Sequence, residues 1–155
     1  MPERAPLRLY GRPSGRAELD WAWVDGQLSV AGTYWVTART EGHPHPRPVW
    51  GVWRGHRLYL SVGTPRTSEA LAADPRVTVH LDSGTEVVIL EGRATGPSSD
   101  AEVLAHYDRK YNWSYDLSVY GPLTCVAPET VLAWRTAGWA GRESFQQTGR
   151  WRFDP

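Results

Sequence analysis

The 155-residue sequence lacks several features that would define a class of protein. It has one cysteine, Cys125, so no disulfide can form within the chain, and we expect a reducing, cytoplasmic environment. No apolar stretch is long enough to span a bilayer and no signal-peptide pattern is present, which argues against a membrane partner. No run of basic residues occurs and the formal net charge is zero, which argues against nucleic acid as the main partner.

Signature motifs of several common sites are also missing. No G-x-G-x-x-G follows a strand, and no Walker A loop, H-E-x-x-H pair or G-x-S-x-G elbow occurs. His43 and His45 lie in a proline-rich turn without a third ligand nearby, so we expect solvent-exposed histidines and no metal site. Cys125 has no obvious local base, which favours a buried structural thiol over a nucleophile.

Tryptophan and arginine are abundant in what remains. The chain has nine tryptophans, which are costly to expose and well suited to stacking on flat ligands, and we expect most of them in the core or in a subunit interface. Lys110 is the only lysine among 17 basic residues. Together with the many alanines, glycines and prolines, this bias indicates a high-GC genome.

The length predicts one domain with a core of its own. We expect an N-terminal extension over residues 1–15, rich in proline, arginine and glycine and poorly ordered, followed by the domain over residues 16–155. From residue 33 the apolar period is two, and the strands expected over 33–39, 45–53 and 57–62 form an antiparallel meander. Pro46 and Pro48 remove two ladder donors, which indicates an edge or a bulge.

Further strands are separated by short helices. The run 87–90 is apolar on both faces, as expected for a barrel strand that also supports a partner. About six antiparallel strands favour a small β-barrel over a sandwich. The remaining expected strands are residues 76–81, 86–94, 123–127, 130–135 and 149–153. The expected helices are a short one within 17–31, one capped by Thr64 that ends near Asp74, and 99–112 with a Ser99/Glu102 capping box; residues 113–121 look irregular.

One group of residues points to an anion. The first N–H groups of a helix are unpaired and carry partial positive charge, so phosphate binds there readily. Hydroxyls and a guanidinium complete such a shell, and Arg47 on a neighbouring strand can add a second cation. An ordinary capped helix with solvated polar residues explains the same spacing equally well. The residues at this helix start are Ser61, Thr64, Arg66 and Thr67.

Four stretches together resemble a known family. They are YWVTA at 34–38, RPVWGVW at 47–53, LAADPRV at 71–77 and VHLDSG at 79–84. In order and spacing they resemble the pyridoxamine 5′-phosphate oxidase-like, or flavin/deazaflavin oxidoreductase, family of FMN-binding split barrels, and in particular its actinobacterial F420-dependent branch. The likeness covers roughly residues 19–153.

The resemblance implies a fold and a cofactor site. It implies a six-stranded antiparallel split β-barrel of Greek-key type with short flanking helices, which forms a homodimer with two cofactor sites in its interface. The cofactor ring, of F420 or FMN, would lie along Pro48, Val49 and Trp50, and its phosphate over Ser61 to Thr67. Family members commonly carry Ser-Arg-Lys and then Asn-Leu in that loop. Here Arg66 is kept, Thr67 replaces the lysine and Ala70 replaces the asparagine, so we expect Arg47 to compensate.

The leading hypothesis is an F420-dependent reductase that passes hydride to a conjugated C=C or quinone-like planar substrate, with secondary metabolism as the suggested setting. An FMN-dependent oxidase or reductase is the alternative within the same fold. A non-catalytic protein that binds a flavin, haem or planar metabolite is the third hypothesis, and the loss of the loop lysine favours it. The substrate walls expected besides Trp50 are Trp53, Trp113 and Trp139, and the candidate proton donors are Tyr107, Tyr111, Tyr115 and His80.

Overall fold

The computed structural model describes residues 1–9, 12–13, 17–136 and 147–154 of the chain. Six strands pair antiparallel in a closed order, as the pairings β5–β6, β7–β8, β8–β11, β11–β10, β10–β9 and β9–β5 show. Strands β6 and β7 follow one another with Trp50 between them, so they count as one broken strand of the ring. The bounds are β5 Tyr34–Ala38, β6 His45–Val49, β7 Gly51–Arg54, β8 Arg57–Leu60, β9 Arg76–His80, β10 Glu86–Ser98 and β11 Leu123–Arg135.

Alternation along these strands separates a core face from an outer face. Val36, Val79, Leu90 and Val131 stand side by side in register and are at most 1% exposed. The neighbouring register row, Trp35, His80, Ile89 and Leu132, points outward and is only partly buried. The predicted mainly antiparallel β architecture is therefore confirmed.

Two strands are longer than expected, because bulges let them bend. β10 and β11 each run for 13 residues, with register shifts at Glu91/Gly92 and Ala94/Gly96. The segments 123–127 and 130–135 are thus one strand, and 86–94 continues to Ser98. The C-terminal half of β11 also pairs with β12, Gln147–Arg152. Strands β1, Glu3–Ala5, and β4, Ala17–Glu18, pair in turn with β12.

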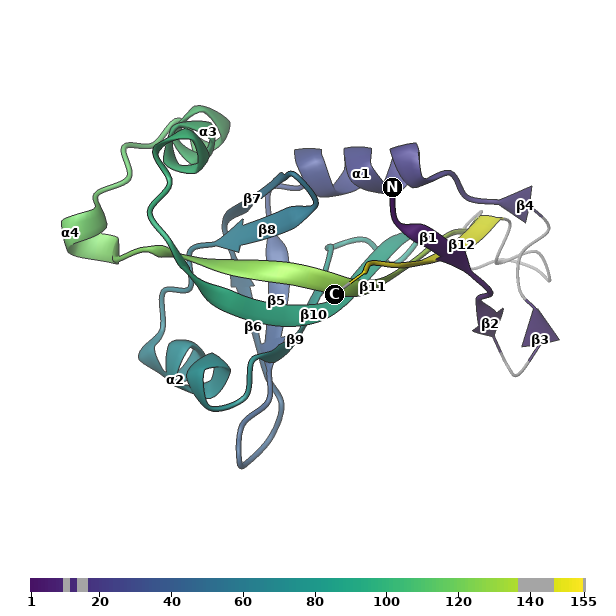
Figure 1. Cartoon of the computed structure of the whole chain (residues 1–155), viewed down its shortest axis with the longest axis horizontal. Coiled ribbons are helices and arrows are strands. Elements are labelled where there is room, and N and C mark those ends of the chain that lie inside the picture. The colour runs from purple at the N-terminus through teal and green to yellow at the C-terminus, as the bar shows by residue number, and fades with distance from the viewer. Residues whose placement is uncertain (10–11, 14–16, 137–146, 155) are drawn as a thin grey trace.

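Part of the segment expected to be poorly ordered is paired. Strand β1 is in antiparallel register with β12, and the Arg4 guanidinium donates to the carbonyls of Leu19 and Thr148 at 2.8 and 3.1 Å. A small hairpin, β2 Arg8–Leu9 with β3 Arg12–Pro13, follows it. Figure 1 shows β1 running beside β12 at the end of the molecule opposite α4.

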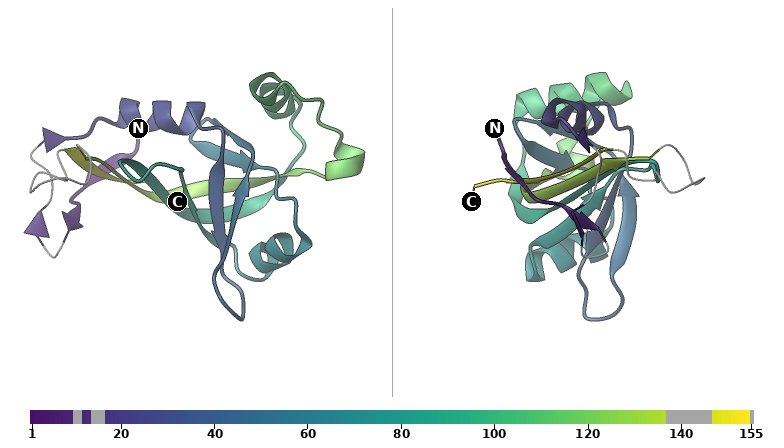
Figure 2. Two further views of the ribbon diagram at one scale, coloured as in Figure 1. Left: turned by 180° about the vertical axis from the view of Figure 1, so that it is seen from behind. Right: turned by 90° about the vertical axis from the view of Figure 1, so that its right-hand side faces the viewer.

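The helices cover two sides of the strands, with α1 and α3 on one side and α2 on the other (Figure 2). Helix α1, Trp21–Val30, is capped by Asp20 and buries Trp21, Val24 and Leu28. Helix α2, Pro65–Ala73, has the predicted bounds and contributes the buried Leu71, but the Thr64 side chain expected to cap it makes no cap hydrogen bond.

Two expectations about the later helices are wrong. Helix α3, Ala101–Tyr111, is capped by Asp100, whose carboxylate accepts from the Val103 N–H at 2.9 Å, and not by Ser99. A short helix α4, Leu117–Tyr120, lies within the segment expected to be irregular. It begins at Asp116, whose carboxylate accepts from the backbone and side chain of Ser118 at 2.8 and 2.6 Å.

Candidate functional site

A pocket of about 380 Å³ opens where the ring of strands is interrupted between β6 and the β8–α2 loop. Strand β6 is an edge, as its prolines predicted: within the described chain its one strand partner is β5. The Trp50 carbonyl accepts from the Ser61 N–H at 2.9 Å and closes the inner end of the opening. The pocket is lined by Arg47, Pro48, Val49, Trp50, Ser61, Val62, Gly63, Thr64, Thr67, Tyr107, Trp113, Tyr115 and Tyr120.

Most of the residues predicted to hold a cofactor therefore meet in one place. The exception is Arg66, which lies against a neighbouring hollow with Arg39 and Glu69 instead of this pocket. The fold brings the other predicted cofactor residues together because β6 and the start of α2 face each other across the opening. The two segments that supply them are residues 47–50 and 61–67.

The start of α2 forms the polar end of the pocket. Thr64 precedes the helix with extended backbone, but its side chain caps no described N–H and instead shares a 2.8 Å hydrogen bond with the Thr67 hydroxyl. Thr67 is 1% exposed, so this position holds a buried hydroxyl. Pro65 has no N–H, and the N–H groups of Thr67 and Ser68 donate to the Thr64 carbonyl at 3.1 and 3.2 Å, so the Arg66 N–H is the first-turn donor left for an anion.

Positive charge gathers beside this helix start. Arg47 is exposed at the pocket wall, and its guanidinium donates to the neighbouring Pro46 carbonyl at 2.7 Å.

Burial lowers the pKa of His45 below its usual value, and the charges of Arg47 and Arg66 lower it further. His45 is thus buried, against the expectation of an exposed turn histidine, because it pairs with Ala38 inside the β5–β6 ladder. Its Nε2 atom has no hydrogen-bond partner among the described residues.

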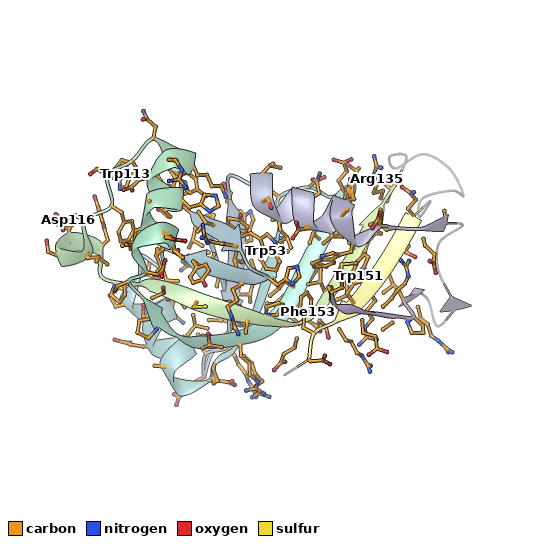
Figure 3. All side chains as sticks on the ribbon, turned by 45° about the horizontal axis from the view of Figure 1, so that its top comes forward. Trp53, Trp113, Asp116, Arg135, Trp151 and Phe153 are labelled. Carbon is orange, nitrogen blue, oxygen red and sulfur yellow. The ribbon has the colours of Figure 1, made fainter. Side chains whose placement is uncertain are left out.

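Aromatic rings form the other wall. Trp50 stacks on Tyr111 with ring centroids 4.5 Å apart and planes 2° from parallel. Trp113 stands edge-on to Trp50 at 5.9 Å and 88°, and Tyr120 follows at 6.3 Å. Trp50, Trp113 and Tyr120 are 43%, 45% and 48% exposed, so flat apolar surface faces the pocket mouth. Figure 3 shows Trp113 at the α3–α4 end of the molecule.

The two other tryptophans expected in the substrate wall do not extend this surface. Trp53 is 4% exposed, and its indole donates to Asp25 Oδ1 at 2.8 Å, which places it in the core beneath α1. Its strand position fixes this, since β7 buries Gly51, Val52 and Trp53 together. Trp139 lies outside the described residues.

Of the four candidate proton donors, Tyr107 and Tyr115 line the pocket. Tyr107 is 3% exposed, and burial raises its pKa to about 12, against the opposing effect of a hydrogen bond with Ser61. Its phenol therefore keeps its proton at neutral pH. The Tyr115 hydroxyl donates to the Gly121 carbonyl at 3.0 Å.

The other two candidates lie elsewhere. Tyr111 sits behind Trp50, and its hydroxyl lies 2.9 Å from both the Gly32 and Gly51 carbonyls. His80 is on the outer face, where it stacks on Trp35 and its Nδ1 lies 2.8 Å from the Leu81 carbonyl. Tyr107 is therefore the donor best placed toward the pocket.

Sequence analysis overlooked Lys110 as a functional residue. It is on α3, three residues after Tyr107 and directly before Tyr111, and its ammonium reaches two barrel strands. The signal available in the sequence was that Lys110 is the only lysine. No group of three or more metal-ligating side chains occurs in the described part of the chain.

Comparisons with known proteins place the fold. No protein-family model and no curated protein matches the sequence. Among solved structures, a FAD-binding protein from Mesorhizobium loti is 17% identical, with a TM-score of 0.60 over 85% of this chain and 94% of its own. An F420 reductase is 15% identical, with a TM-score of 0.57 over 69% of this chain and 94% of its own.

A protein of the pyridoxinephosphate oxidase family from Clostridium acetobutylicum is similar to the same degree. It is 15% identical, with a TM-score of 0.53 over 74% of this chain and 86% of its own. The fold thus resembles that of the pyridoxamine 5′-phosphate oxidase-like split barrels, a group of structures that includes flavin- and F420-associated proteins. In the described residues, no helix is both long and apolar enough to cross a membrane.

Proposed function

We propose that this chain is an oxidoreductase that uses a flavin-type cofactor, with F420 favoured over FMN, to reduce a conjugated C=C or quinone-like planar substrate. The observation that carries the proposal is the shared pocket, where an edge strand, a helix start with a nearby arginine and a wall of aromatic rings face the same space. Fold similarity to a FAD-binding protein and an F420 reductase supports the same cofactor class.

The residues present fit such a cofactor. The open edge of β6 leaves backbone groups free to contact a ring, Pro48 and Val49 line the pocket there, and the flat surface of Trp50 lies beside them. The first turn of α2, the hydroxyls of Ser61 and Thr64, and Arg47 offer donors and positive charge to a phosphate. When bound, the cofactor supplies the hydride.

The other steps fall to side chains of this chain. Trp50 and Trp113 form an apolar wall that orients a flat substrate and excludes water from the reacting face. The Tyr107 hydroxyl, which is protonated at neutral pH and lines the pocket, donates the proton that a substrate carbanion needs. Tyr107 is accordingly our candidate catalytic acid.

A non-catalytic binding protein is the second candidate, and one observation favours it. Thr67 is buried and hydrogen-bonded to Thr64, so the pocket lacks the loop lysine expected from the family resemblance. Anaerobic turnover separates the two functions. Reduced F420 mixed with the protein and menadione should be oxidised at a rate proportional to protein concentration. Saturable binding of F420 without such turnover would support the binding protein.

We also propose a homodimer that places the cofactor at the subunit interface. The outer row of Trp35, His80, Ile89 and Leu132 is too apolar for a solvated sheet face, and a second copy would cover it. Cytoplasmic localisation, with neither nucleic acid nor membrane as a partner, completes the proposal and accords with the single buried thiol of Cys125.

A further inference from the structure

Lys110 ties one helix to two strands of the barrel. Its Nζ donates to the Tyr34 hydroxyl at 2.9 Å and to the Gly51 carbonyl at 2.8 Å. The same ammonium lies 4.8 Å from the centroid of the Tyr34 ring and 5.2 Å from that of Tyr111. Helix α3, strand β5 and strand β7 therefore meet at a single cation.

Among the described residues, no acid balances the charge of Lys110. Within the described chain no carboxylate forms an ion pair with it, and burial lowers its pKa to about 8. A partly buried cation held by a hydroxyl, a carbonyl and two rings adds little to the free energy of unfolding, since desolvation offsets those contacts. An apolar side chain of similar length would serve stability as well. Its contribution must then be sought in what it holds in place.

The groups held by Lys110 are those that set Trp50. Gly51 directly follows Trp50, and its N–H donates to the Tyr111 hydroxyl at 3.0 Å. Tyr111 in turn carries the stacked ring of Trp50 on its face. Lys110 thus contacts both the backbone next to Trp50 and the ring on which Trp50 rests. Trp50 is the residue at the β6–β7 break, where the pocket opens.

We propose that Lys110 is a positioning residue, which fixes Trp50 and the β6–β7 break in the arrangement that the pocket requires. It acts through Tyr111 and Gly51 and does not itself line the pocket formed by the described residues. Its importance for a ligand rests on the proposed function, but its effect on Trp50 does not. The charged form makes both cation–π contacts, so deprotonation weakens the hold on Tyr34 and Tyr111.

The surroundings make Lys110 the group that titrates near pH 8. Tyr34 faces it from β5, and Tyr111 and His106 from α3, while β7 presents the Gly51 carbonyl. Burial raises the pKa of both tyrosines, with the Tyr111 hydroxyl raising that of Tyr34 further. Burial lowers the pKa of His106, as does the charge of Lys110. Below about pH 8 the charged Lys110 ammonium holds the Trp50–Tyr111 stack. Above about pH 8 the neutral amine lets this stack loosen.

The test measures the Trp50–Tyr111 stack in the ligand-free protein. Near-ultraviolet circular dichroism, followed from about pH 6 to about pH 9.5, should change with a midpoint close to the lysine pKa. Lys110→Met should show the high-pH spectrum throughout, and Trp50→Phe should lose the signal. Arg109→Met, which removes an exposed cation from the same helix, should behave like the unmodified chain. A spectrum that is independent of pH, or unchanged by Lys110→Met, overturns the proposal.

Binding of FMN and of F420 supplies the second readout. Lys110→Met should weaken whichever probe binds by about tenfold, and Lys110→Arg, which keeps the cation, should recover part of the loss. Equal affinities in Lys110→Met and Arg109→Met would contradict positioning. If neither probe binds the unmodified chain, the proposed function fails, and the dichroism alone decides the role of Lys110. If Lys110→Met does not fold, the titration of the unmodified chain and Lys110→Arg still decide it.

Discussion

At the scale of single residues, local sequence identified one side of the pocket better than the other. Arg47, Ser61 and Thr64 were found because they lie on short segments whose strand and helix positions follow from spacing alone. Lys110 was missed because its partners, Tyr34 and Gly51, are 76 and 59 residues away in the sequence. Trp53 was assigned to the pocket because a strand pattern does not tell which face meets a ligand.

Arg47 offers the sharpest prediction at this scale. Arg47→Ala should weaken cofactor binding by about ten- to a hundredfold, because it removes the exposed guanidinium beside the α2 start, where a charge-assisted hydrogen bond is worth about 1.5–3 kcal/mol. Fluorescence titration measures the loss. Arg57→Ala, which removes an exposed cation on β8, is the matched control and should leave the affinity unchanged. Unchanged cofactor affinity in Arg47→Ala would contradict a role of Arg47 in cofactor binding.

Gly51 lies so close to strand β8 that there is no room for a side chain. A Cβ atom there would lie 2.6 Å from the Tyr59 carbonyl and 2.7 Å from the Leu60 side chain. Gly51→Ala should therefore lower the free energy of unfolding by about 2 kcal/mol or more. Gly26→Ala, within α1 and with open space around it, should instead raise it by about 0.5–1 kcal/mol. Chemical denaturation of both variants checks the opposite signs.

At the scale of elements, strands were easier to foresee than helix ends. Alternating apolar residues and turn signals located the strands near their observed positions. The two long strands were divided or cut short, because bulges at Glu129 on β11 and at Thr95 on β10 break the period that marks a strand. Helix α4 was missed because four residues give no periodicity to detect.

The start of α3 provides a test of how local capping works. Asp100→Ala should lower the melting temperature by about 3 °C, because it removes the cap of the Val103 N–H, worth about 1 kcal/mol. Ser99→Ala, one residue earlier and exposed, should change it little. Thermal unfolding of the two variants compares them directly. A larger effect at Ser99 would restore the capping box that the sequence predicted.

At the scale of the whole molecule, closure of the strand ring depends on pairings that no short motif contains. The β5–β9 and β8–β11 pairs join segments about 40 and 65 residues apart, and they create both the core and the opening at β6. The sequence indicated the barrel through strand number and family resemblance. Trp113 was expected in the substrate wall, but Tyr120 was not, since the short helix α4 that carries it was not predicted.

The outer face leads to a prediction about assembly. Ile89→Asp should convert a dimer into a monomer, because it places a carboxylate within the apolar row that a second copy would cover. Light scattering at several protein concentrations measures the mass. Val119→Asp, which changes a 68% exposed apolar residue on α4, is the matched control and should leave the dimer intact. Dissociation by Val119→Asp alone would move the interface to α4.

The central claim, that the pocket at β6 holds a flavin-type cofactor, is tested most directly by titrating the unmodified chain with F420 and, separately, with FMN. Trp50 and Trp113 line the pocket, so a bound ring should quench tryptophan fluorescence. We predict saturable quenching by F420 in the micromolar range, with weaker quenching by FMN. The absence of saturable quenching by either cofactor would contradict the claim.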